Sequence, residues 1–146
     1  MATRFLLTYA IVSAFAGAVL AQPADIYKQG HSHQGDAYDV GPRQKPWPIA
    51  GIGTAHFPIT TKNPEVQHWF DQGNALLHSF WYYEAERAFR WCLKLEPENA
   101  MAYWGLARAS EDSKRAADFL AEAIKRKGKV TERERLYIEE IGRAHV

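Results

Sequence analysis

The sequence predicts an all-α fold built from antiparallel helical hairpins, and three observations support this prediction. Two bulky residues, Trp69 and Phe89, stand where they can fill the space between two packed helices. Pro97 then follows the second helix, and a proline ends a helix because it lacks a backbone N–H and clashes with the preceding turn. Tyr103 stands 34 residues after Trp69, which indicates that the two-helix unit repeats.

Residues 1–21 have the features of a secretory signal peptide. Arg4 precedes an apolar run of 16 residues, Phe5 to Leu20, and Ala21 supplies a small residue at the expected cleavage point before Gln22. A membrane-spanning helix needs about 20 apolar residues, so cleavage is favoured over an uncleaved anchor. We therefore expect a periplasmic or secreted protein with no membrane span after cleavage.

The charge balance argues against a nucleic-acid partner. The chain contains 18 Lys and Arg residues and 17 Asp and Glu residues, and loss of Arg4 with the signal peptide leaves the mature chain neutral. A neutral chain has no electrostatic basis for binding nucleic acid or an anionic membrane.

Residues 22–63 are predicted to form an extended, loop-rich leader. Glycine, proline, histidine and isolated aromatic residues occur there without a sustained helical or alternating apolar period. A segment of this length without secondary structure is unusual in a compact domain unless it has a role. The apolar residues from Trp47 onward predict that this part lies along the outside of the first hairpin.

Four residues of the leader have metal-ligand chemistry: His31, His33, Asp36 and Asp39. Two imidazoles followed by two carboxylates can hold copper or zinc if a turn at Gly35 brings them together. The alternative is a solvated loop, because no rigid element orients these side chains.

The helical region, residues 64–146, divides into three parts. Residues 64–99 make the first repeat, with Asn63 as the cap of its first helix and Pro64 at the start. Residues 100–128 make a degenerate second repeat whose second helix begins three residues early, which predicts a shortened turn. Residues 131–146 begin a further helix, with Thr131 as the cap and Glu134 three residues on.

This region resembles the tetratricopeptide repeat. With Pro97 set at the terminal proline of the repeat, six residues fall on signature positions: Trp69, Gly73, Tyr82, Ala85, Phe89 and Pro97. Gln72 replaces the usual leucine, Leu76 the usual aromatic residue and Cys92 the usual alanine. Residues 51–109, including the segment from His56 to Thr61, resemble a group of exported bacterial proteins with such repeats. The resemblance implies an α-solenoid, in which the hairpins stack into a right-handed superhelix.

Stacked repeats bury their apolar faces against neighbours, and roughly three or more are usually needed for stability. We therefore expect this chain to be the N-terminal part of a longer protein.

The resemblance also implies a binding surface on the concave face, which the first helix of each repeat lines. Carried over position by position, this face contains Phe70, Asn74, Leu77, His78, Trp104 and Arg108. Asn74 and Arg108 stand at equivalent positions and can hydrogen-bond a peptide backbone or a carboxylate, while the aromatic residues offer apolar contact. The alternative is that Phe70 and Trp104 pack against the leader or against further repeats.

Two further expectations concern the second helix of the first repeat. The single cysteine excludes an intramolecular disulfide, and Cys92 is expected to pack as a small core residue rather than to act as a reactive thiol. Glu84 and Glu86 are three or four residues from Arg87 and Arg90, so we expect solubilising ion pairs on the exposed side of this helix.

Two hypotheses about function remain. The first is a non-catalytic exported scaffold that binds a protein or peptide partner through its repeats and needs no cofactor. The second is a metal-handling or redox-associated exported protein that uses its histidine-rich leader, and metal uptake lost on His31→Ala with His33→Ala would distinguish it. The sequence has no Ser-His-Asp order, phosphate-binding glycine loop or paired carboxylates in an apolar setting, so no catalytic residue is predicted.

Overall fold

The computed structural model describes residues 41–144. These residues form five α-helices and one 3-10 helix: α1 (Pro64–His78), α2 (Tyr82–Leu95), α3 (Ala100–Ala109), α4 (Ser113–Arg126), η2 (Lys127–Lys129) and α5 (Glu132–Ala144). Residues 41–144 contain no β-strand, so the all-α class is confirmed for this part of the chain. The predicted signal peptide and the proposed metal ligands His31, His33, Asp36 and Asp39 lie outside the described residues.

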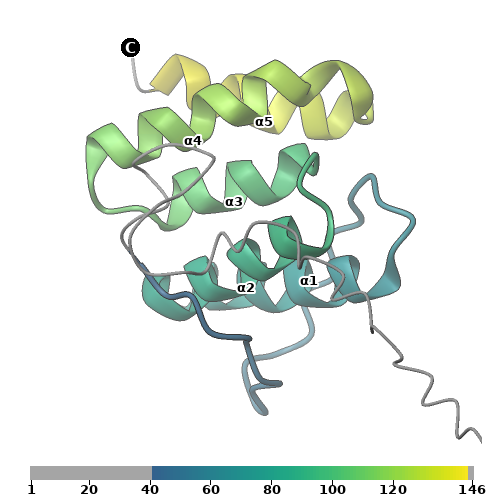
Figure 1. Ribbon diagram of the computed structural model, residues 1–146, viewed down its shortest axis with the longest axis vertical. Coiled ribbons are helices and arrows are strands. Elements are labelled where there is room, and N and C mark those ends of the chain that lie inside the picture. Colours follow the sequence, from purple (N-terminus) through teal and green to yellow (C-terminus); the bar gives the residue numbers. More distant parts are fainter. Residues whose placement is uncertain (1–40, 145–146) are drawn as a thin grey trace, which may run out of the picture.

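The helices stack in chain order (Figure 1). α1 and α2 lie at one end of the stack, α3 lies in the middle, and α4 and α5 lie at the other end. Consecutive helices pack on one another, and α5 packs on both α4 and α3. Turns of three residues join α1 to α2 and α3 to α4, so the two helices of each pair run antiparallel. The described chain is therefore two helical hairpins followed by a fifth helix.

Both ends of α1 are set by local backbone chemistry. The side chain of Asn63 accepts a hydrogen bond of 2.9 Å from a backbone N–H of the first turn, and Pro64 takes the first helical position, as predicted. At the other end, the N–H of Trp81 donates to the carbonyl of Leu76 at 3.0 Å, and Phe80 adopts a φ of 61°. This is a Schellman motif, in which a residue in the left-handed conformation ends the helix.

Phe89 of α2 sets how closely α1 and α3 approach. Its ring is fully buried and lies against Gly73 of α1 and Gly105 of α3. A Cβ added at Gly73 would lie 2.7 Å from this ring, and one added at Gly105 would lie 2.6 Å from it, both far inside van der Waals contact. The two glycines therefore make the space that the ring fills, and α1 and α3 are held on either side of it.

The second hairpin is shorter than the first, but not at its turn. The turn between α3 and α4, residues 110–112, is as long as the turn between α1 and α2, residues 79–81. The predicted shortened turn is therefore wrong, and the missing residues come from α3, which has 10 residues against 15 in α1. The reason is capping, because the side chain of Asn99 caps α3 and that of Asp112 caps α4.

The predicted capping box at the start of α5 is confirmed. The N–H of Thr131 donates to Oε2 of Glu134 at 2.9 Å, and the N–H of Glu134 donates to Oγ1 of Thr131 at 3.4 Å.

Residues 41–49 of the leader lie against the first hairpin, which confirms the prediction at Trp47 and Ile49. The amide of Gln72 in α1 donates to the carbonyl of Trp47 at 3.0 Å and accepts from the N–H of Ile49 at 3.1 Å. Gln72 stands where the repeat pattern has leucine. A glutamine fits this position because it satisfies the backbone groups of the leader that covers it.

The ion pairs of α2 form as predicted but are not exposed. Arg90 is 1% exposed, Glu86 5% and Arg87 7%. Oε1 of Glu86 lies 2.7 Å from Nη2 of Arg90 and 2.6 Å from Nη2 of Arg115 in α4. The backbone of Gly41 lies directly over this carboxylate, where any side chain at Gly41 would overlap it. The expectation of an exposed face is wrong because the leader covers it.

A second part of the leader, residues 56–61, crosses from α1 of the first hairpin to α3 and α5. We call this segment the strap. The ring of Phe57 lies 6.0 Å from that of Phe70 in α1, 6.4 Å from that of Trp104 in α3 and 5.0 Å from that of Tyr137 in α5. The prediction that the leader from Trp47 onward follows the outside of the first hairpin is therefore wrong for the strap, which crosses three helices.

Candidate partner-binding site

A pocket of about 320 Å³ lies beside the strap, between α1, α3 and α5. Its walls combine apolar and polar side chains, namely Phe57, Asn74, Leu77, His78, Trp104, Arg108, Tyr137, Glu140 and Ile141. The helical residues of its lining come from α1, α3 and α5. The pocket therefore lies on the face formed by the first helix of each hairpin and by the fifth helix. We call this face the concave face.

The structure brings together five of the six residues that the sequence predicted for partner binding. Asn74, Leu77 and His78 come from the last turns of α1, and Trp104 and Arg108 come from α3. The pairing of these two helices follows from the wedge of Phe89 between their glycines. Residues separated by 34 positions, such as Asn74 and Arg108, therefore face one pocket.

Phe70, the sixth predicted residue, does not line the pocket. Its side chain is fully buried, and its ring lies 5.5 Å from that of Phe89 and 6.0 Å from that of Phe57. Trp104 is 6% exposed and its ring is stacked on that of Phe57. The alternative considered from the sequence, that Phe70 and Trp104 pack against the leader, is therefore what the structure has in the described part of the chain.

Several polar groups of the pocket have no partner among residues 41–144. Arg108 and Glu140 form no ion pair there, although the neighbouring Arg135 pairs with Glu139 at 3.1 Å. The amide of Asn74 makes no hydrogen bond within the same residues. The indole N–H of Trp104 is buried and has no acceptor within them. Unpaired buried donors carry a free-energy cost, so this pocket holds binding capacity that the described fold leaves unused.

The sequence assigned no site role to Phe57, Tyr137, Glu140 or Ile141, although they line the same pocket. The three residues of α5 are spaced i, i+3 and i+4, which places them on one side of a helix. That spacing is visible in the sequence, but it does not tell which neighbour this side faces. The place of Phe57 depends on the path of an irregular segment, which no periodicity predicts.

The strap forms one wall of the pocket and is held by side chains of α1. The N–H of Phe57 donates to Oδ1 of Asp71 at 3.0 Å, and the N–H of Ile59 donates to Oε1 of Gln67 at 3.0 Å. Nε2 of Gln67 donates to the carbonyl of Phe57 at 2.9 Å. Two side chains therefore satisfy the backbone of an extended segment, in the way that a neighbouring strand would.

The far end of the strap is fastened to α5 through Glu134. Oε1 of Glu134 accepts from the N–H of Thr60 at 2.6 Å, and Oε2 accepts from the hydroxyls of Thr60 at 2.5 Å and Thr131 at 2.6 Å. Glu134 is fully buried. Burial acts to raise the pKa of this carboxyl, but the hydrogen bonds from Thr131 and Thr60 outweigh burial, so the pKa is lowered from its ordinary value of 4.5.

Glu134→Gln is expected to destabilise the protein by about 1–3 kcal/mol near neutral pH, because the buried hydroxyl and N–H donors lose a charged acceptor. The folded-state pKa is lowered, so this contribution is present above the unfolded-state pKa, near 4.5, and is lost as the pH falls through the folded-state pKa. Urea unfolding of both proteins from pH 7 to pH 3 should therefore show a stability gap that narrows in acid.

Glu132→Gln is the matched control, since Glu132 is exposed at the start of the same helix. We expect it to change stability by less than about 1 kcal/mol. A gap between wild type and Glu134→Gln that stays constant down to pH 3 would contradict the assigned hydrogen bonds.

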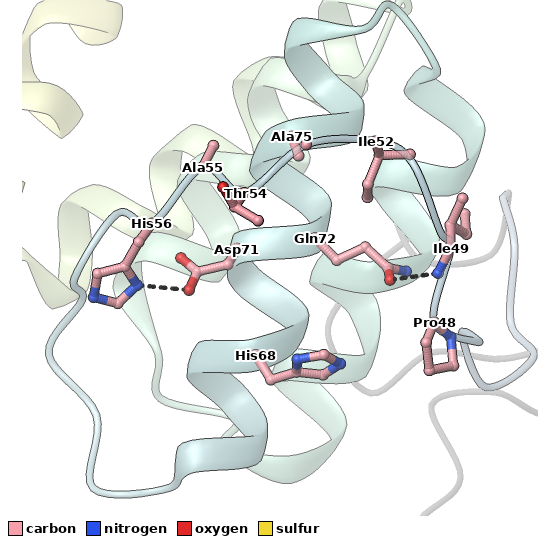
Figure 2. Close-up of a pocket in the computed structure, with 11 residues that line it drawn as sticks. Pro48, Ile49, Ile52, Thr54, Ala55, His56, His68, Asp71, Gln72 and Ala75 are labelled. Carbon is pink, nitrogen blue, oxygen red and sulfur yellow. Dashed lines mark hydrogen bonds and ion pairs between the residues drawn. The ribbon is translucent and has the colours of Figure 1, made fainter.

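A second hollow of about 300 Å³ lies where residues 48–56 pass over α1. Figure 2 shows His56 directed at Asp71 and Gln72 bonded to Ile49, with His68 one turn away on α1. Nδ1 of His56 lies 2.7 Å from Oδ2 of Asp71. The polar groups that line this hollow are thus used largely to hold the leader on α1.

Cys92 packs as the small core residue that the sequence predicted. It is fully buried, and its Sγ lies 3.4 Å from the carbonyl of Val66. Burial raises the pKa of this thiol well above its ordinary value. Because the thiolate is the reactive form, Cys92 is not set up as a nucleophile.

Within residues 41–144, no group of three His, Cys, Asp or Glu side chains is placed to hold a metal ion. No helix in that range is long and apolar enough to cross a membrane. No family model, curated protein or solved structure matches this chain. The functional argument therefore rests on the geometry of the pocket itself.

Proposed function

We propose that this chain is an exported, non-catalytic scaffold of the tetratricopeptide-repeat type that binds a protein or peptide partner on its concave face. One observation carries the proposal. Five residues that the resemblance to the repeat assigned to partner binding line a single pocket: Asn74, Leu77, His78, Trp104 and Arg108.

The arrangement of the helices supports the solenoid part of the proposal. In stacked two-helix repeats, the first helices form one continuous surface, which is where extended partners bind. The pocket is lined by α1, α3 and α5, and α2 and α4 contribute none of its residues. The export part of the proposal rests on the signal-peptide features of residues 1–21.

The chemistry of the pocket suits a peptide. Trp104 and Leu77 offer apolar contact, while Asn74 and Arg108 offer donors that suit backbone carbonyls and carboxylates. Glu140 adds an acceptor of opposite charge to the same pocket. Such a mixture of apolar floor and unpaired polar groups is typical of protein interfaces.

A displayed library of random peptides selected on the full chain tests this function. We expect selected peptides to bind wild type, and Asn74→Ala with Arg108→Ala to weaken binding by about tenfold or more, which corresponds to about 1.4 kcal/mol. Fluorescence anisotropy with a labelled selected peptide measures both affinities.

The matched control is Lys114→Ala with Asp118→Ala, which removes an exposed ion pair of 3.2 Å on α4, away from the pocket. This variant should bind as wild type does. If no peptide is enriched on wild type or on Phe57→Ala, or if the pocket variant and the control variant bind equally well, the proposed function is wrong.

A further inference from the structure

The strap is bound to the concave face in the way that a separate peptide would be. Asp71 and Gln67 hydrogen-bond the N–H groups of Phe57 and Ile59, and Gln67 also bonds the carbonyl of Phe57. The three backbone groups belong to an irregular segment without a strand partner. Side chains that hydrogen-bond an extended backbone in this way give affinity for the segment that does not depend on its amino-acid sequence.

Phe57 supplies the side-chain part of the same interaction. Its ring is T-shaped to that of Tyr137, at a centroid distance of 5.0 Å and an interplanar angle of 87°, and it is stacked on that of Trp104 at 16°. The guanidinium carbon of Arg133 lies 4.3 Å from the centre of the ring. The aromatic ring is thus half-buried among α1, α3 and α5 and acts as the anchor of the strap.

The chain immediately before the strap is exposed and loosely packed. Gly51 and Gly53 have φ values of 82° and 90°, and an added Cβ at either position would meet nothing within 4 Å. Residues 53–56 are exposed. A segment with few buried contacts opens at a lower free energy than the helices that it covers.

The ring of Trp104 is stacked on that of Phe57, and its indole N–H is buried without an acceptor in the described chain. A peptide that replaces the strap can bring a backbone carbonyl to this donor, which the strap does not. The strap is therefore an incomplete match for the surface on which it lies.

We propose that the strap is an internal ligand, and that the partner of the concave face is an extended peptide whose aromatic residue takes the place of Phe57. This inference rests on the proposed function and deepens it. The covalently attached strap competes with the partner at a high effective concentration. If the strap is lifted in only about 1% of molecules, the apparent affinity for the partner falls about 100-fold.

A labelled peptide with the sequence of residues 54–62 tests the inference, titrated by anisotropy against the full chain. The strap should block this peptide in wild type, and Phe57→Ala should raise its affinity at least tenfold. The same peptide with alanine in place of its phenylalanine is the matched control and should not bind either protein. Equal binding of the two peptides to Phe57→Ala, or no binding of either, would overturn the inference.

Amide hydrogen exchange of the wild-type protein is a second test, which does not require Phe57→Ala to fold. The N–H groups of Phe57 and Ile59 should exchange through an opening of lower free energy than the core amides of α1. If these amides exchange only with global unfolding, the strap is a fixed wall and the inference is wrong. Library peptides that still depend on Asn74 and Arg108 would then leave the proposed function standing.

Discussion

Phe89→Ala is expected to lower the free energy of unfolding by about 3–5 kcal/mol, the range for removing a fully buried aromatic side chain. The ring lies between Gly73 and Gly105, so two helix backbones border the cavity that it would leave. Glycines have no side chains that can move into that space, and collapse is therefore limited. Urea denaturation should show a lower midpoint with an unchanged m value.

Tyr83→Ala is the control for this substitution, because Tyr83 is an aromatic residue of the same helix that is 59% exposed. We expect it to cost less than about 1 kcal/mol. A loss for Phe89→Ala no larger than this would mean that the ring does not hold α1 and α3 together.

Gly105→Ala tests the same wedge from the other side. Alanine gains about 1 kcal/mol of helix propensity over glycine, but its Cβ would lie 2.6 Å from the buried ring, so overpacking of about 1–3 kcal/mol should dominate. In a Phe89→Leu background the clash is relieved, and the same substitution should become neutral or stabilising. Additive effects of the two changes would contradict the assigned contact.

Arg90→Met is expected to destabilise the protein by about 3–5 kcal/mol, because it leaves the buried carboxylate of Glu86 without one of its two cations. Arg90 is 1% exposed and donates to Glu86 through both Nε, at 2.8 Å, and Nη2, at 2.7 Å. Arg115 remains as a partner of Glu86 at 2.6 Å, but Arg115 belongs to α4 and cannot fill the space left by Arg90 in α2. Thermal and urea unfolding of the variant measure the loss.

Arg90→Met with Glu86→Leu separates the burial of a charge from the loss of a contact. Removing both members of a buried pair is often far less harmful than removing one, so the double variant should recover part of the stability lost by Arg90→Met. If Glu86→Leu further lowers the free energy of unfolding of Arg90→Met, the unpaired carboxylate of Glu86 is not what destabilises Arg90→Met.

Features that depend on neighbouring residues were predictable from the sequence. The cap at Asn63, the start at Pro64 and the capping box at Thr131 use side chains within three residues of the backbone groups that they satisfy. The wedge residue Phe89 and the small Gly73 were recognised from their spacing. The shortened turn was predicted wrongly, since a fixed repeat length was given more weight than the caps at Asn99 and Asp112.

Most residues of the candidate pocket were also predictable, since a helical repeat puts equivalent positions on one face. The residues that were missed come from α5, whose packing partner the sequence does not reveal, and from the leader at Phe57. The leader also sets the roles of four other residues. Gln72 and Gln67 hydrogen-bond the backbone of the leader, and Glu86 and Arg90 are buried beneath it at Gly41. None of these four roles has a local signature, because each partner is distant in the chain and lies in a segment without periodicity.

The amino-acid sequence by itself indicated the helical class and the caps at Asn63 and Thr131. Through its resemblance to the repeat, it also indicated most of the residues that α1 and α3 turn toward a common face. Where the leader crosses, which charges it buries and how α5 closes the pocket became clear only in the folded chain. The physical reason is the range of the interactions. Helix periodicity and capping act within about one turn, whereas the strap joins Thr60 to Glu134 across 74 residues, a contact that exists only once the helices are stacked.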